Sequence, residues 1–337
     1  MNNKKVTSIE VAKLAGVSQS AVSRVFTPSA SSSKKTNELV RKAATELGYR
    51  PNILARSLIT GKTRIIGLVV AYLDNYFYPE ALELLSSALQ KKGYHVLIFM
   101  SGNKEGDIAD AVDGILDYQV DGIIAASVSM SSDLAKRCVS AGVPVVLFNR
   151  TQDDERLSAV TSDNLLGGQK VARFLLDGGH KRIGYIAGWE GAATQRDRER
   201  GFKDELNRSG HKLYAREVGN FNLDEARQAA RNMFSKKDFP DAVFIANDAM
   251  AIAVIDVIRF ELGLKVPDQV SVVGYDDVPI SSWPAYDLTT VRQPANRMVS
   301  ETVSILMDSI DNKNTQARRV QIDGPLMVRG SARIPNK

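Results

Sequence analysis

The sequence is short of the residues and segments on which several classes of protein depend. It has one cysteine, Cys138, and three histidines in 337 residues, so an intramolecular disulfide is excluded and no metal-ligand cluster is indicated. Its apolar run at 65–73 is nine residues long, too short to span a bilayer. The opening MNNKKVTSIEVAK is basic but has no apolar segment behind it, unlike a secretory signal. We therefore expect a cytoplasmic protein without a membrane partner.

Acidic residues are also scarce, but only in the first part of the chain. Residues 1–62 contain eleven Lys and Arg against three acids, a net charge of +8, whereas the other 275 residues carry −3. A basic segment beside a mildly acidic remainder favours a polyanionic partner for that segment alone. The alternative is a solvated basic face without a partner, and charge by itself does not separate the two.

Three short helical patterns fill the first fifty residues. Thr7, followed three residues later by a glutamate, forms a capping box for the first helix, and Gly16 ends that helix. Ser18 can cap a second helix at 19–26, and a third helix begins near Ser33. The pattern predicts a compact three-helix domain.

The first two helical patterns are typical of a helix-turn-helix. Ala12 is small enough for two helices to cross closely, and Gly16 permits a tight turn, while Val17, Val22 and Val25 bury the second helix. This leaves Gln19, Ser20, Ser23 and Arg24 exposed on the second helix. A recognition helix enters the major groove with its N-terminal residues at base edges, where Gln and Arg are good hydrogen-bonding partners. An ordinary helical hairpin is the alternative, but the basic charge favours double-stranded DNA as the partner.

After residue 62 the pattern changes to apolar runs that alternate with amphipathic helical stretches. The apolar runs lie at 65–71, 95–100, 122–126 and 143–148, and a second set lies at 183–187, 242–246 and 270–275. Continuous apolar strands joined by crossover helices predict parallel sheets covered on both faces. Two sets of strands predict two α/β lobes with a ligand cleft between them.

Polar residues directly follow four of these apolar runs. The pairs are Asp74-Asn75, Asn149-Arg150, Asn247-Asp248 and Asp276-Asp277. Because a doubly wound sheet opens its crevice at the carboxyl ends of its strands, these side chains are candidate ligand contacts. The alternative is that they cap the following helices, which we expect of about half of them.

Enzymatic function is disfavoured by the same pattern. Adjacent carboxylates such as Asp276 and Asp277 point to opposite faces of a strand, so they cannot act together as acid and base. There is no Gly-rich phosphate loop and no Gly-x-Ser-x-Gly motif, and GYIAG at 184–188 lacks dinucleotide-binding spacing. We expect neither an enzyme nor a cofactor. The second alternative is a solute-binding protein without a regulatory role. The basic segment and the lack of a secretory signal argue against it.

Three motifs carry a family resemblance: VSQSAVSRV at 17–25, ELGYRPN at 46–52 and LARSLITGK at 54–62. Together they resemble the lactose/galactose-repressor (LacI/GalR) family of transcriptional regulators, and the similarity continues through nearly the whole chain. The resemblance implies an α/β protein with an N-terminal helix-turn-helix domain and a two-lobed body like the periplasmic binding proteins. The implied ranges are 1–50 for the DNA-binding domain, 51–63 for a hinge helix and linker, and 64–337 for the effector-binding and dimerisation domain. Its lobes would comprise 64–161 with 291–320, and 162–290 with 321–337.

The resemblance also implies a homodimer that places two recognition helices in successive major grooves of a near-palindromic operator. The implied DNA-contacting residues are Thr7, Ser18, Gln19, Ser20, Ser23, Arg24, Ser33, Asn52, Ala55 and Leu58. Leu58 would enter the minor groove as a wedge, which costs unstacking energy and gains contact with bent DNA; linker packing is its alternative role. Phe26-Thr27 departs from the Leu-Asn of many relatives. No heptad pattern follows the last strand-like segment, which favours a dimer over a tetramer.

The effector site implied by the resemblance draws on both lobes. Its residues are Asn75, Phe77, Tyr78, Asn149, Asp163, Arg198, Phe221, Asn247 and Asp276. Arg198 suits vicinal hydroxyls or a carboxylate, and Asp276 can accept hydrogen bonds from two hydroxyls. The effector is therefore expected to be a sugar or sugar derivative. The implied function is allosteric control of operator affinity by this small molecule, in a nucleoid-associated repressor of carbohydrate-metabolism genes.

Overall fold

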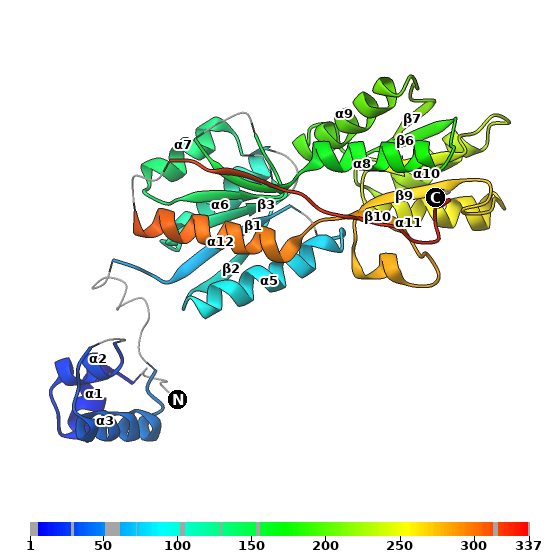
Figure 1. The fold of residues 1–337 in the computed structure, drawn as a ribbon. Coiled ribbons are helices and arrows are strands. Elements are labelled where there is room, and N and C mark those ends of the chain that lie inside the picture. Colours follow the sequence, from blue (N-terminus) through cyan, green and yellow to red (C-terminus); the bar gives the residue numbers. More distant parts are fainter. Residues whose placement is uncertain are drawn as a thin grey trace. The chain divides into compact units, whose positions relative to one another are not determined.

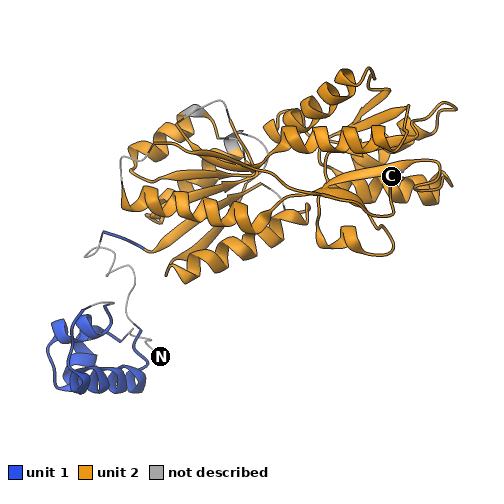
Figure 2. Ribbon diagram, in the orientation of Figure 1, with its two compact units in different colours: residues 1–63 blue, residues 64–337 orange. Residues whose placement is uncertain are grey.

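The computed structural model describes residues 6–27, 30–50, 61–71, 73–101, 105–128, 130–152, 156–312 and 316–335. The chain divides into two compact units, Met1–Thr63 and Arg64–Lys337 (Figure 2). The two units differ in secondary structure. The first is helical, and the second alternates helices with strands.

The first unit contains the three predicted helices, α1 (Ser8–Ala15), α2 (Gln19–Val25) and α3 (Lys34–Leu47). Gly16 ends α1 in the left-handed conformation, with φ of 64°, which a residue without Cβ adopts at little cost. The apolar faces meet in one small core of Val11, Ala12, Val22, Val25, Val40, Ala43 and Ala44. The helix-turn-helix prediction is therefore confirmed.

The second unit contains two six-stranded sheets. The sheet of the first lobe has the order β11-β5-β4-β3-β1-β2, and that of the second lobe has the order β12-β10-β9-β8-β6-β7. The first-lobe strands are β1 (Ile65–Val70), β2 (His95–Met100), β3 (Gly122–Ala126), β4 (Val145–Phe148), β5 (Ser158–Ser162) and β11 (Arg319–Ile322). The second-lobe strands are β6 (Ile183–Ala187), β7 (Ala215–Val218), β8 (Ala242–Ile245), β9 (Ser271–Asp276), β10 (Thr289–Arg292) and β12 (Leu326–Met327). The strand pairs are parallel except β10 with β12, which is antiparallel.

Helices cover the sheets on both faces, as continuous apolar strands require (Figure 1). In the first lobe these are α5 (Phe77–Lys91), α6 (Glu105–Asp117), α7 (Ser132–Ser140) and α12 (Ala295–Asp311). In the second lobe they are α8 (Asn164–Asp177), α9 (Ala193–Arg208), α10 (Leu223–Phe234) and α11 (Asp248–Asp256), with a π-helical turn η1 (Val257–Glu261) and a 3-10 turn η2 (Pro279–Ser282). The predicted fold class is thus confirmed. No helix in the described part of the chain has the length and apolar character needed to cross a membrane.

Five strands have no counterpart among the predicted apolar runs. β5 is buried along its whole length but has the sequence SAVTS, and β7, β10, β11 and β12 are short or polar. Their positions depend on tertiary pairing rather than on a local hydrophobic pattern.

The chain crosses between the lobes three times. It does so after β5, after β10 and after β11, so each sheet is completed by a distant segment (Figure 1). β10 extends the second sheet to Arg292 and β11 extends the first to Ile322. These strands therefore end two residues beyond the lobe boundaries expected at 290 and 320. These three segments connect the walls of the interlobe cleft.

Candidate nucleic-acid interface and ligand cleft

The second helix of the first unit buries one face and exposes the other. Val22 and Val25 are buried in the three-helix core. The four residues predicted to read bases, Gln19, Ser20, Ser23 and Arg24, are all exposed. Gln19 Nε2 donates a 3.0 Å hydrogen bond to Ser8 Oγ, which holds the amide near the start of α2. The helix thus presents a polar face of the kind that enters a major groove.

Three other residues predicted to contact DNA are helix caps. The Thr7 N–H donates to Glu10 Oε2 at 2.7 Å, which is part of a capping box. Ser18 Oγ accepts from the N–H of Ala21 at 3.2 Å, and Ser33 Oγ accepts from the N–H of Thr36 at 3.1 Å. Each cap satisfies an amide that would otherwise lack an intrahelical partner. A phosphate contact would add to this structural role.

Phe26 and Thr27, which differ from the Leu-Asn of many family members, make their contacts within the first unit. The Phe26 ring lies 5.9 Å from that of Tyr49, and the Arg41 guanidinium lies over it at 5.9 Å. Thr27 Oγ1 donates to the carbonyl of Ser23 at 2.8 Å. The predicted hinge contacts Asn52, Ala55 and Leu58 lie outside the described residues.

Polar side chains of the two lobes meet directly in the second unit. Asn75 follows β1 of the first lobe, and its Nδ2 donates to Oδ2 of Asp276, at the end of β9 in the second lobe, at 3.1 Å. Gln293 follows β10, and its Nε2 donates to Asp276 Oδ1 at 2.6 Å. All three side chains are buried. Asp276 therefore joins the first lobe, the second lobe and a crossover.

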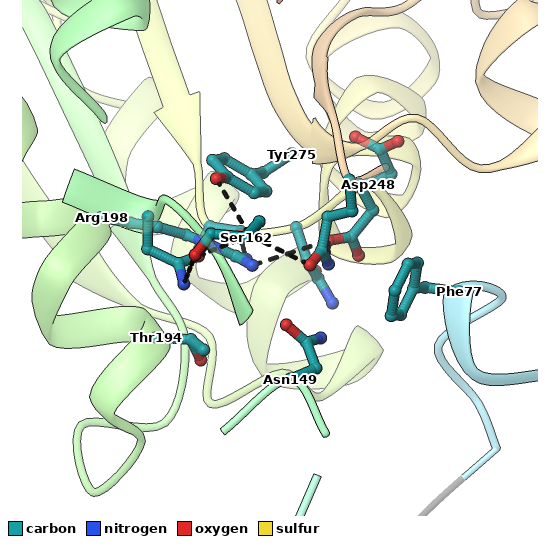
Figure 3. Close-up of polar contacts among 12 residues, drawn as sticks. Phe77, Asn149, Ser162, Thr194, Arg198, Asp248 and Tyr275 are labelled. Atoms are coloured by element: carbon teal, nitrogen blue, oxygen red, sulfur yellow. Dashed lines mark hydrogen bonds and ion pairs between the residues drawn. The ribbon is translucent and has the colours of Figure 1, made fainter. Parts of the chain in front are cut away.

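Arg198 lies at the centre of the second lobe's polar cluster (Figure 3). Its Nε donates to Asn164 Oδ1 at 2.7 Å, and its Nη1 donates to the carbonyl of Ala246 at 2.5 Å. The guanidinium also lies over the Tyr275 ring at 3.7 Å, and its Nη2 is 3.8 Å from Asp276 Oδ1. Hydrogen bonds thus hold the edge of the guanidinium, and the Tyr275 ring packs on its face. The group places a positive charge beside Asp276.

Burial dominates the acidity of Asp276. It raises the pKa of this carboxyl to about 7, although the Arg198 guanidinium opposes the rise, while the neighbouring Asp248 carboxylate adds to it. The hydrogen bonds from Asn75 and Gln293 favour the charged form and also oppose the rise. The Asp276 carboxyl therefore changes its charge near neutral pH.

Asp276 is expected to make folding stability depend on pH between about 4 and about 7. Because an unfolded Asp has a pKa of about 3.9, the folded chain holds a proton over this range that the unfolded chain releases. Stability from this carboxyl is complete below about pH 4 and is lost as pH rises through about 7. Asp276→Asn should remove this part of the slope, which urea unfolding at a series of pH values measures. An unchanged slope would contradict the raised pKa.

The first lobe also contributes aromatic rings and a second amide. Asn149 follows β4 in the left-handed conformation, with φ of 56°, and its Nδ2 donates to the Tyr78 hydroxyl at 3.2 Å. Asn149 Oδ1 is buried and has no hydrogen-bond partner among the described residues. Phe77 is also buried, and it stacks on Phe148 at 6.2 Å in the core of the first lobe. Figure 3 shows Phe77 and Asn149 beside the second-lobe polar cluster.

Two of the predicted ligand residues are helix caps, and for Asn247 this is the alternative expected of residues that directly follow an apolar run. Asp163 Oδ1 accepts from the N–H of Leu166 at the start of α8, at 2.9 Å. Asn247 Oδ1 accepts from the N–H of Met250 at the start of α11, at 3.0 Å. Asn247 Nδ2 is buried without a hydrogen-bond partner among the described residues. This amide can therefore cap the helix and also donate a hydrogen bond.

The other acidic residues at the strand ends hold the second lobe together. Asp248 is fully buried and accepts hydrogen bonds from the N–H of Val278 and the hydroxyls of Ser281 and Thr290. Asp277 pairs with Arg292 and Arg329, both at 2.6 Å. These two carboxylates have other partners than Asp276, so the geometry shows no acid–base pair built from them.

The second unit also contains a cavity of about 650 Å³. It is lined by Asp74, Arg150, Trp189, Glu190, Asn220, Phe221, Asn222 and Glu225. Of the predicted effector residues, Phe221 alone is in this lining. The lining of this cavity thus includes neither Arg198 nor Asp276.

Arg150 links the lobes at this cavity. Its Nη1 donates to Thr194 Oγ1 of the second lobe at 3.1 Å, and its Nη2 donates to Ser127 Oγ of the first lobe at 3.3 Å. Arg150 is one of the polar residues that directly follow an apolar run, but the predicted effector residues do not include Arg150, Thr194, Trp189 or Gln293. Trp189 follows β6 in the same way as the predicted polar pairs follow their strands, so its position could have identified it as a candidate ligand contact. Gln293 follows β10, a strand that the sequence pattern does not predict.

A small helical unit with an exposed recognition helix, in one chain with a two-lobed α/β body that has a polar cleft, defines a ligand-responsive DNA-binding regulator. A family model described as bacterial regulatory proteins, lacI family, matches residues 9–52, and one described as a periplasmic binding protein-like domain matches residues 172–332. The HTH-type transcriptional repressor PurR of Vibrio vulnificus is 30% identical over 330 residues, which are 97% of this chain and 98% of that protein. The chain belongs to the LacI family of bacterial transcriptional regulators.

Solved structures extend the similarity to the fold as a whole. The Lac repressor dimer bound to operator and the anti-inducer ONPF matches with a TM-score of 0.88 and 26% identity, covering 97% of this chain and 99% of that one. A complex of the transcriptional regulator CelR with cellobiose matches with a TM-score of 0.73 and 32% identity, covering 97% of this chain and 100% of that one. The predicted family and architecture are confirmed.

Proposed function

We propose that this repressor controls carbohydrate-metabolism genes and that a sugar or sugar derivative bound between its lobes sets its affinity for operator DNA. The observation that carries this proposal is the buried polar cluster of Arg198, Asp276 and Asn75, which draws on both lobes. A ligand that replaces the direct Asn75–Asp276 hydrogen bond changes what holds the lobes together, and such a change can be transmitted to the DNA-binding unit.

The chemistry of the cluster suits hydroxyl groups. Arg198 is a fixed donor, Asp276 accepts hydrogen bonds, and Asn149 Oδ1 and Asn247 Nδ2 offer a buried acceptor and a buried donor without partners among the described residues. A sugar presents several hydroxyls, each of which donates and accepts. The Phe221 ring at the cavity adds an apolar face of the kind on which a sugar ring can pack. The cellobiose in the complex of the related CelR is consistent with this chemistry.

We propose that the DNA partner is a near-palindromic operator bound by a homodimer in the cytoplasm. The related Lac repressor is described as a dimer bound to operator. In this chain, β2 is an edge strand of the first sheet, and Ile98 and Met100 on it are each 52% exposed. An apolar, unpaired strand edge favours burial against another chain. Leu58, with Asn52 and Ala55, is proposed to contact the minor groove at the centre of the operator.

No comparable observation supports the two alternative functions, a solute-binding protein and an enzyme. A solute-binding protein has no use for the exposed recognition helix, and we propose no catalytic activity because Asp248 and Asp277 are engaged in structural contacts. DNA binding separates these functions. Only the regulator is expected to bind DNA with an affinity that falls steeply as the salt concentration rises.

Selection of binding sites from random DNA with the full chain should yield inverted repeats. A homodimer presents two equivalent recognition helices, so its half-sites are related by two-fold symmetry. Sedimentation of the complex should show two chains per site. A panel of neutral sugars should contain a compound that changes affinity for the selected site, and the sign of the change distinguishes inducer from corepressor. Asymmetric selected sites, or affinity that no sugar alters, would contradict the proposal.

A further inference from the structure

The third crossover, which follows β11, leaves one sheet and enters the other within two residues (Figure 1). At its first end it is still paired with the first crossover, since the N–H of Asp163 donates to the carbonyl of Ile322 at 2.9 Å. At its second end it is already paired with the second crossover, since the N–H of Arg292 donates to the carbonyl of Pro325 at 2.9 Å. Residues 323 and 324 alone lie between these two hydrogen bonds.

On the third crossover, rotation of one lobe against the other has to be taken up at Asp323 and Gly324. The residues on either side are held in sheet ladders, and Pro325 fixes its own φ at about −65°. A hinge of this kind absorbs a domain rotation in a few residues. Gly324 is buried, and a Cβ there would lie 1.9 Å from the carbonyl oxygen of Arg292. The second and third crossovers therefore pack too closely for a larger residue at this position.

Lys170 of the second lobe reaches this two-residue segment and binds both of its members. Its Nζ donates to the carbonyl of Gly324 at 2.8 Å and forms an ion pair with the carboxylate of Asp323. Lys170 lies on α8, which Val171 and Leu175 anchor in the second-lobe core. Asp323 directly follows the first-lobe strand β11. Lys170 thus connects the end of a first-lobe strand to a second-lobe helix.

The two contacts of Lys170 differ in strength. The side chain of Asp323 is 56% exposed, and an ion pair with so exposed a partner contributes little, because water screens it. A hydrogen bond from a charged donor contributes more, equivalent to about tenfold or more in an equilibrium constant. Its acceptor is the carbonyl of the buried Gly324. Lys170 therefore acts mainly through this carbonyl.

We propose that Lys170 is a hinge clamp, which holds Asp323 and Gly324 in the conformation seen here and so stabilises this arrangement of the lobes. The clamp acts without a ligand, and its contacts include neither Arg198 nor Asp276. Removal of the clamp shifts the population toward other lobe arrangements. Its effect on operator affinity rests on the proposed function, in which the arrangement of the lobes is transmitted to the DNA-binding unit.

Hydrogen–deuterium exchange of the full-length protein measures the clamp directly. The reporters are the amides of Asp163 and Arg292, whose hydrogen bonds end on the third crossover. Lys170→Met removes the charge and the donors but keeps most of the apolar length, and it should speed exchange of both amides about tenfold. Lys136→Met is the matched control, because the ion pair of Lys136 with Asp133 lies within α7. It should leave both amides unchanged.

Two further measurements separate a clamp from general structural support. Asp323→Asn removes the ion pair and keeps the bond to the Gly324 carbonyl, so it should speed exchange of the same amides about twofold or less. The amides of β3 and β8, in the cores of the two lobes, should exchange in Lys170→Met as they do in the parent. A residue that only supports the fold would speed exchange in these strands as well.

Operator affinity is the second readout, measured by fluorescence anisotropy on a site that the parent selects from random DNA. Lys170→Met should change this affinity about threefold or more without any sugar, and Lys136→Met should not change it. Unchanged exchange at the two reporter amides, or faster exchange throughout the chain, would show that Lys170 is not a clamp and would leave the proposed function standing.

The two proposals can also fail separately at the operator. If Lys170→Met speeds local exchange without changing operator affinity, while D-glucose, D-ribose, cellobiose or another neutral sugar changes the affinity of the parent, the clamp has no regulatory role and the proposed function stands. If no sugar changes the affinity of the parent and Lys170→Met does not change it either, both proposals are wrong.

Discussion

We expect Arg198→Ala to abolish the effect of the proposed sugar on operator binding, while operator affinity without sugar should stay close to that of the parent. The guanidinium contributes charge-assisted hydrogen bonds, each of about 1.5–3 kcal/mol, so sugar affinity should fall about tenfold to a hundredfold or more. The variant also removes the buried donors to Asn164 Oδ1 and the carbonyl of Ala246, which should lower the free energy of unfolding by about 3 kcal/mol. Fluorescence anisotropy with labelled operator measures the first effect, and urea unfolding measures the second.

Arg200→Ala is the matched control for this substitution. Arg200 lies on the same helix, but its side chain is 63% exposed and pairs with Asp197 on the surface. Its removal should alter neither the sugar response nor, beyond about 0.5 kcal/mol, the stability. An Arg198→Ala protein that is folded and still responds normally to sugar would show that the ligand site lies elsewhere.

We expect Gln19→Ala to alter the base preferred at one symmetric pair of positions in the two half-sites. Gln19 is exposed at the start of α2, and its contact is with the exposed Ser8 hydroxyl, which a base edge can replace. A bidentate contact discriminates between base pairs by about 1–3 kcal/mol, which is about tenfold or more for each half-site. Selection from random DNA with the variant measures this loss directly.

Leu58→Ala provides the comparison for the Gln19 variant. A wedge favours the central step that unstacks most easily and makes few hydrogen bonds. Its loss should weaken specific binding and reduce DNA bending, with little change in half-site preference, which gel mobility and site selection report. If the Gln19 variant selects the same half-site as the parent, other residues of α2 read the bases.

Much of the fold follows from local patterns in the chain. The capping box at Thr7, the left-handed Gly16 and the cap at Ser18 determine the first two helices, because each satisfies backbone groups within a few residues. The strands β1, β3 and β6 were predictable for a related reason, since their continuous apolar runs have to be buried on both faces.

The site was only partly predictable in the same way. Polar residues after strands are placed at the cleft by topology alone, and Asn75, Asn149 and Asp276 are found there. The same rule does not distinguish a side chain that caps a helix from one that is free to bind a ligand. Asp163 is engaged as a cap, and Asn247 combines a cap with an unpartnered Nδ2. The roles of these residues toward a ligand stay predictions.

The sequence by itself determined the helix-turn-helix, the two α/β lobes and the family, because these depend on hydrophobic periodicity, capping and short motifs. Only the tertiary structure decided that Arg150 bridges Ser127 and Thr194, that Trp189 and Phe221 flank it, and that Gln293 contacts Asp276. These residues come from segments far apart in the chain, and they meet because three crossovers connect the lobes. Contacts of this kind arise from the packing of whole elements, so no local pattern contains them.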